Sequence, residues 1–143
     1  MGRRRVVITG MGVISPLGSE LETVWKALIT GQSGIRTISR FDASAFDSRI
    51  AGEVVEFQVD DFIPKKEQRR MDPYSHYGLA ATKLAVADSG LDFSTLNPQR
   101  CGVIFGTGTG GLITLQEQQE IMITRGPKRI SPFVIPMMIT NIL

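Results

Sequence analysis

The sequence predicts an α/β domain with a largely parallel sheet. Residues 5–9 and 101–105 are short apolar runs with several β-branched side chains and no polar alternation, which is typical of strands buried on both faces. Helical patterns lie between these runs, and strands that alternate with helices of this length indicate parallel crossover connections. The 143 residues, of which 42% are hydrophobic and 21% charged, suffice for one globular domain.

The first helix is expected directly after the strand at residues 5–9. Ser19 and Glu22 have the spacing of a capping box, and Gly31 predicts a left-handed stop. The expected apolar stripe consists of Leu21, Val24, Trp25 and Leu28. Residues 35–62 hold weaker strand signals, of which 50–55 is the best, and their order is left open.

Two further helices are predicted from their ends. Asp72 followed by Pro73 is typical of a helix start, and Gly90 ends that helix after Ser89. Its many Gly and Ala residues favour close approach to a neighbouring backbone, so we expect it to be buried. The other helix is traced by Leu112, Leu115, Gln119 and Met122, and it ends at Gly126.

Composition limits the function classes. No apolar run reaches the roughly 20 residues that cross a bilayer, and no signal peptide is recognisable, so we expect a cytoplasmic protein without a membrane partner. The single cysteine agrees with a reducing compartment, and no His/Cys cluster has metal-ligand spacing. A net charge of +2 does not indicate nucleic-acid binding. Two local basic groups could instead contact an acidic partner; they are Lys65, Lys66, Arg69 and Arg70, and then Arg125, Lys128 and Arg129.

Several motifs have ordinary structural explanations. Gly10 and Gly12 begin a dinucleotide fingerprint, but Ser15 stands where the third glycine is needed, so a nucleotide site is not expected. The glycine-rich loop at residues 106–111 could bind phosphate or could simply need positive φ angles, and the residues alone leave both open. Cys101 is expected to be a buried structural cysteine rather than a nucleophile.

Several segments, in order, carry a resemblance to a known family. The amino-terminal run RRVVITGMG at residues 4–12 is followed by SPLG at 15–18, KEQRRMD at 66–72, GTGTGG at 106–111, GPKRISPFVIP at 126–136 and PMMITN at 136–141. Together they resemble the type II elongating β-ketoacyl-acyl-carrier-protein synthases. The resemblance covers the whole chain and implies a thiolase-like fold, of which residues 1–143 would be the amino-terminal part of the first half only.

The resemblance also implies site residues. The glycine loop would border an acyl-chain pocket at a dimer interface, and the residues matching substrate-binding positions are Gly108, Thr109, Phe133 and Val134. Many relatives have a larger apolar residue in place of Thr109 and an aromatic one in place of Val134, so the pocket depth is expected to differ. The basic residues matching those that contact the acidic carrier protein are Lys66, Arg69, Arg70, Lys128 and Arg129.

The implied reaction is acyl transfer from a phosphopantetheine-bearing carrier protein to a cysteine, followed by decarboxylative condensation with malonyl-carrier protein. The family needs no cofactor or metal. Its catalytic cysteine and histidines lie beyond residue 143, so the chain alone is expected to be inactive, with no catalytic residue of its own. Two alternatives stay open: a polyketide ketosynthase or its chain-length partner, and a non-catalytic module that binds carrier protein.

Overall fold

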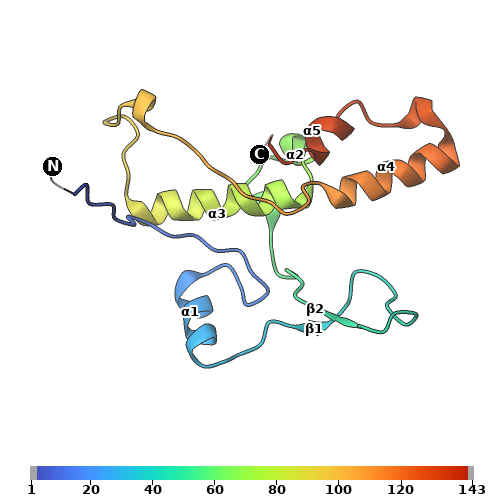
Figure 1. The fold of residues 1–143 in the computed structure, drawn as a ribbon, viewed down its shortest axis with the longest axis horizontal. Helices are drawn as coiled ribbons and strands as arrows, with labels where there is room; N and C mark the ends of the chain where they lie inside the picture. The colour runs from blue at the N-terminus through green and yellow to red at the C-terminus, as the bar shows by residue number, and fades with distance from the viewer. Residues whose placement is uncertain (1–2, 142–143) are drawn as a thin grey trace. The chain divides into compact units, whose positions relative to one another are not determined.

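A computed structural model describes residues 3–141, which form two compact units (Figure 1). Unit 1 contains residues 3–58 and 81–91, and unit 2 contains residues 59–80 and 92–141. The long helix α3, Pro73–Ser89, contributes its first half to unit 2 and its second half to unit 1. No helix among residues 3–141 is both long and apolar enough to span a membrane.

Unit 1 holds α1, Leu21–Ile29, and a small antiparallel sheet of β1, Arg36–Thr37, and β2, Ile50–Ala51. The cap of α1 is Glu20 rather than the expected Ser19, because the Glu20 carboxylate accepts a hydrogen bond from the Thr23 amide at 3.2 Å. The predicted stop is confirmed, since Gly31 has a φ of +69°.

The buried side of α1 differs from the predicted stripe. Val24 and Ala27 are buried, whereas Trp25 and Leu28 are 59% and 57% exposed. Periodicity identifies which residues share a face, but the neighbours available in the tertiary structure decide which part of that face is covered.

One buried carboxylate joins the segments that follow β1 and β2. Glu53 is 7% exposed and accepts hydrogen bonds from the Ser39 amide at 2.9 Å, the Ser39 hydroxyl at 2.7 Å and the Arg40 amide at 3.2 Å. The Ser39 hydroxyl, followed by the Ser39 amide, lowers the pKa of Glu53 below its ordinary value. Residues 39–40 are therefore held next to β2 by a charge that exists only above the pKa of Glu53.

The carboxyl-terminal half of α3 packs closely on the segment around Gly10 and Gly12. A Cβ atom at Gly10 would meet the backbone of Ala85 and Ser89, and one at Gly12 would meet the backbone of Ala81. The close backbone approach expected of α3 is thus confirmed. The helix itself is half-buried along most of its length rather than fully buried.

Unit 2 is mainly helical. It contains η1, Val59–Asp61; α2, Lys65–Gln68; the first half of α3; η2, Pro98–Arg100; α4, Leu112–Arg125; η3, Pro127–Arg129; and α5, Val134–Met138. Helix α4 contacts both η3 and α5. The predicted ends of α3 and α4 are confirmed, since Gly90 and Gly126 have φ values of +62° and +84°.

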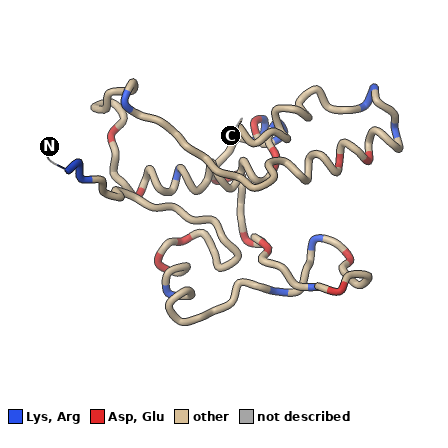
Figure 2. The backbone as a smooth tube through the Cα atoms, in the orientation of Figure 1, with Lys and Arg blue, Asp and Glu red and all other residues tan. Residues whose placement is uncertain are grey.

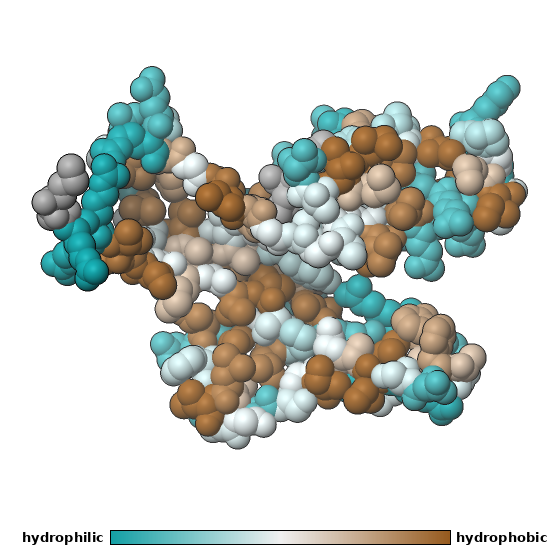
Figure 3. Space-filling view, viewed as in Figure 1, coloured by the Kyte–Doolittle hydropathy of each residue, from teal (hydrophilic) through white to brown (hydrophobic). Residues whose placement is uncertain are grey.

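The two predicted central strands are not formed as strands. Residues 5–9 and 101–105 have no regular secondary structure, and Val6 and Ile104 are 93% and 100% exposed. Figure 3 shows several groups of hydrophobic side chains, in brown, on the visible surface. A strand needs ladder partners for its backbone groups, and no segment in the described chain pairs with either run. The prediction that Cys101 is buried is wrong for the same reason, because it lies in one of these uncovered runs.

Candidate functional site

The best-buried acidic group in unit 2 is Asp72, immediately before α3. Asp72 is 2% exposed, and its Oδ2 accepts hydrogen bonds from the amide of Thr114 at 2.8 Å and from its hydroxyl at 2.7 Å. Its Oδ1 accepts from the Tyr74 amide at 3.2 Å. The preceding cap of α4, Gly111, has no side chain that could bind an unpaired amide. One carboxylate therefore serves the amino-termini of two helices.

The glycine loop leads directly into α4 and packs against α5. Gly110 has a φ of +67° and Gly111 donates to the Met138 carbonyl at 2.9 Å. A Cβ atom at either buried glycine would collide with the carbonyl oxygen of Met137 or Met138. These contacts explain Gly110 and Gly111 without a ligand, whereas Gly106 and Gly108 have open space beside them.

Residues 131–139 are held by hydrogen bonds from two helices. The Ser131 amide donates to Gln118 Oε1 of α4 at 2.7 Å, and the Tyr74 hydroxyl of α3 donates to the Ile139 carbonyl at 2.8 Å. Phe133 forms the cap of α5, and Val134 is its first residue. The segment expected to reach an acyl pocket is thus fixed at both ends within unit 2.

The first basic group lies on and just after α2. Lys65 forms an ion pair with Asp60 at 3.2 Å, and a hydrogen bond from Gln68, followed by the effect of Lys65, lowers the pKa of Asp60. The Arg70 guanidinium lies over the Phe133 ring, 5.0 Å from its centroid. Within residues 3–141, Lys66 and Arg69 have no ion pair or ring contact.

The second basic group lies where α4 passes into η3. Arg125 ends α4, and Lys128 and Arg129 belong to η3. Figure 2 shows blue Lys and Arg positions close together in the tube where α4 passes into the following turn. Arg125, Arg129 and Ile121 line an open hollow. Within the described part of the chain, no carboxylate forms an ion pair with Arg125, Lys128 or Arg129.

The structure brings together some of the sequence-predicted site residues. Phe133 and Arg70, assigned separately to substrate and carrier binding, are in direct contact. Thr109 is exposed beside the buried Gly110, and Val134 is half-buried at the start of α5, whose end contacts the loop. Sequence reasoning missed the link from Asp72 to Thr114, since 42 residues separate them and no local pattern connects a helix cap to a distant helix.

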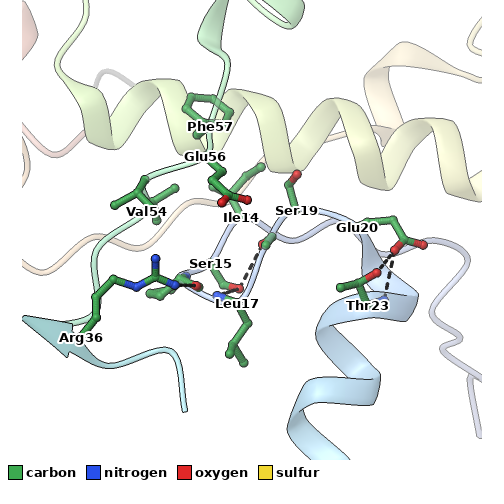
Figure 4. A pocket seen from close by; sticks show the side chains of 13 residues that line it. Ile14, Ser15, Leu17, Ser19, Glu20, Thr23, Arg36, Val54, Glu56 and Phe57 are labelled. Atoms are coloured by element: carbon green, nitrogen blue, oxygen red, sulfur yellow. Dashed lines mark hydrogen bonds between the residues drawn. The ribbon is translucent and has the colours of Figure 1, made fainter. Parts of the chain in front are cut away.

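Unit 1 contains a separate hollow of about 240 Å³ (Figure 4). It lies between the turn at residues 15–18, the start of α1 and residues 54–57. Arg36 donates to the Pro16 carbonyl at 3.3 Å at its edge. None of the sequence-predicted site residues lines this hollow, and the described residues contain no cluster suited to a metal ion.

Known proteins are similar to this chain over nearly its whole length, but the chain covers only part of each of them. The 3-oxoacyl-[acyl-carrier-protein] synthase 2 of Synechocystis is 45% identical over 139 residues, which are 97% of this chain and 33% of the relative. The synthase 2 of Vibrio harveyi is 44% identical over 143 residues, or 100% of this chain and 34% of the relative. The chain therefore spans about a third of the length of these relatives.

Solved structures agree on the fold. The ishigamide ketosynthase/chain length factor superposes with a TM-score of 0.81 at 33% identity, covering 94% of this chain and 34% of that one. A type II polyketide ketosynthase in complex with its acyl-carrier protein gives 0.79 at 26% identity, covering 99% and 37%. The thiolase-like α/β class predicted from the sequence is thus confirmed, although its parallel strands are not paired in the described chain. Residues 3–143 match the amino-terminal domain of the beta-ketoacyl synthases, and the chain belongs to that family.

Proposed function

We propose that this chain is the amino-terminal third of a 3-oxoacyl-[acyl-carrier-protein] synthase, and that unit 2 supplies part of its carrier-binding surface and acyl-chain pocket. The complete enzyme would condense an acyl thioester with malonyl-carrier protein in fatty acid elongation. The observation that carries the proposal is the placement in unit 2 of two exposed basic groups, of which one contacts Phe133 through Arg70 and the other follows α4, whose Gln118 binds Ser131.

Sequence identity favours fatty acid elongation over polyketide synthesis. The two 3-oxoacyl-[acyl-carrier-protein] synthases described above are 44–45% identical to this chain, whereas the type II polyketide ketosynthase is 26% identical and the ishigamide ketosynthase/chain length factor 33% identical. The polyketide complex still supports a carrier protein as partner, because that ketosynthase was solved bound to one. A cytoplasmic homodimer is the assembly we expect of the complete enzyme.

The carrier-protein surface consists of Lys66 and Arg69 beside α2 and of Lys128 and Arg129 in η3. All four are exposed, so an acidic partner can reach them without breaking an internal ion pair. Charges at the rim of an interface act mainly on encounter rate and specificity, and salt screens them. Arg70 belongs to this group by sequence, but its contact with Phe133 gives it a second role, developed below.

Carrier binding can be tested with the chain itself. We expect holo-acyl-carrier protein to bind it with an affinity that falls as ionic strength rises, as measured by titration calorimetry. Charge reversal at Lys66 and Arg69 should weaken binding, whereas reversal of Arg3, in unit 1, should not. If the affinity changes neither with ionic strength nor on charge reversal at Lys66 and Arg69, this surface is not where the carrier protein binds.

The acyl-chain pocket is tested at Thr109 in a complete synthase carrying this chain. Thr109→Phe should slow acylation by long primers before short ones, because each methylene that no longer fits is worth about 0.8 kcal/mol of transfer free energy. Thr109→Val, which is close to threonine in size, serves as the control at the same position. An unchanged length preference would mean that Thr109 faces away from the substrate.

The chain alone is proposed to lack condensing activity. Cys101 is exposed, and its Sγ lies 3.4 Å from the Asn97 carbonyl oxygen, which cannot act as a base toward the thiol. Purified chain should give no condensation product from acyl- and malonyl-carrier proteins. Turnover that Cys101→Ser abolishes would make Cys101 a nucleophile and contradict this assignment. Carrier binding without any activity in the complete protein would instead favour a non-catalytic carrier-binding module.

A further inference from the structure

We propose that Arg70 positions Phe133, and that Lys66 and Arg69 make the contact with the carrier protein from this basic group. The assignment rests on the proposed function, because it divides a surface that we expect to meet the carrier. It also changes the role that the resemblance alone implied for Arg70.

The cations of this group differ in their internal partners. Lys65 is 3.2 Å from an Asp60 carboxylate oxygen, and the guanidinium of Arg70 is 5.0 Å from the centre of the Phe133 ring. Throughout residues 3–141, Lys66 and Arg69 have no comparable contact. An acidic partner must therefore compete with Asp60 for Lys65, and it can bind Arg70 only in orientations that keep the guanidinium on the Phe133 ring or give up that contact. Lys66 and Arg69 carry neither constraint.

The contact between Arg70 and Phe133 has the geometry of a cation–π interaction. Such contacts are attractive when the cation lies within about 6 Å of the ring centroid, and a planar guanidinium can stack on the ring as an ammonium cannot. Phe133 is 39% exposed, and the guanidinium of Arg70 lies over part of a ring that would otherwise face water.

The backbone around Phe133 is already fixed on the side of α4. The Ser131 amide donates to Gln118 at 2.7 Å, and the Ser131 Oγ accepts from the Phe133 amide at 3.1 Å. The Phe133 carbonyl in turn accepts from the Met137 amide at 3.0 Å inside α5. Arg70 adds the contact that orients the ring, and with it the first turn of α5, which carries Val134.

Loss of Arg69 and loss of Arg70 should have different effects on carrier affinity and on the environment of Phe133. Two residues that only contacted the carrier protein would behave alike. Loss of Arg69 should weaken carrier binding and leave Phe133 in place. Loss of Arg70 should change the environment of Phe133 and leave carrier affinity nearly constant.

The experiment uses the purified 143-residue chain with Arg69→Gln and Arg70→Gln as a matched pair, since both remove one charge from adjacent residues. The Kd for holo-acyl-carrier protein at low salt should rise about 1.5-fold to 5-fold for Arg69→Gln, the range of an exposed ion pair, and less than about 1.5-fold for Arg70→Gln. In NMR spectra, the Arg70 side-chain protons should be shifted upfield by the Phe133 ring, and Phe133→Leu should remove that shift.

A double-mutant cycle gives a third readout. The Tm changes caused by Arg70→Gln and Phe133→Leu should not add in the double variant, because either change already removes the shared contact. Arg69→Gln with Phe133→Leu should be additive.

Two results would overturn the assignment: an increase in Kd for Arg70→Gln equal to that for Arg69→Gln, or the absence of a ring shift on Arg70. If the wild-type chain does not bind carrier protein, the proposed docking surface is refuted. The positioning role of Arg70 is then decided by the NMR shift and the cycle alone.

Discussion

Replacement of Asp72 tests how one buried carboxylate stabilises unit 2. Its three hydrogen bonds reach the Tyr74 amide, the Thr114 amide and the Thr114 hydroxyl at 3.2, 2.8 and 2.7 Å. The Thr114 amide lies in the first turn of α4, where no helical carbonyl is available to it. Asp72→Ala removes all three acceptors at once.

The expected loss follows from these contacts. Removal of a helix cap costs about 1 kcal/mol, and a buried donor left without a partner costs about 1–3 kcal/mol. Thr114 is only 3% exposed, so water cannot easily replace the carboxylate. Together these terms predict a loss of about 3 kcal/mol in the free energy of unfolding for Asp72→Ala. Asp72→Asn keeps one side-chain oxygen and should lose less.

Urea unfolding followed by circular dichroism measures the change, with hydrogen exchange locating it. The Thr114 amide should lose protection in Asp72→Ala, because the carboxylate is its acceptor. Asp61→Ala, which removes an exposed carboxylate from the same unit, is the control. A loss below about 0.5 kcal/mol for Asp72→Ala, the range of ordinary surface substitutions, would refute the double-cap reasoning.

Three further predictions use other parts of the chain. Because the pKa of Glu53 is lowered in the folded chain, Glu53 stabilises the fold fully above its ordinary pKa of 4.5, and this stabilisation is lost as pH falls through the lower folded pKa. Glu53→Gln should therefore make the free energy of unfolding depend less on pH in the acid range. An unchanged dependence would exclude Glu53 as its source. Gly111→Ala should lower the Tm, because the new Cβ atom would meet the Met137 carbonyl. Gly106→Ala is the control, because the space beside Gly106 is open and the Tm should change little. Equal changes in Tm would argue against close packing of the glycine loop on α5. Ile104→Lys should reduce concentration-dependent self-association in sedimentation velocity, since Ile104 is fully exposed and the exposed run at 101–105 offers unpaired backbone groups to a second copy. Unchanged association would place the contact elsewhere.

The sequence predicts the start and buried face of α1 less well than the ends of α3 and α4. Ser19 and Glu22 fit a capping box, yet Glu20 caps α1, because an acidic side chain one residue later can also reach the Thr23 amide. Trp25 was assigned to the buried stripe but is mostly exposed. Where several residues could cap a helix or face its buried side, the contacts in the folded chain decide which of them does.

The family motifs identified the scaffold but not the partners of individual side chains. Resemblance placed Arg70 with the carrier-binding cations and Phe133 with the substrate-binding residues, and the structure puts the two in contact. Gly110 and Gly111 were recognised as special, but only the structure shows that the backbone of Met137 and Met138 occupies the space where their side chains would be.

The sequence by itself determined where α3 and α4 begin or end, because Pro73, Gly90 and Gly126 act through the backbone conformation of a few adjacent residues. It also determined that residues 5–9 and 101–105 are apolar, but not whether they pair, since a ladder needs a second strand. Only the tertiary structure decided that Asp72 reaches Thr114 across 42 residues. Such contacts depend on how distant segments meet in space, and local propensity contains no information about that.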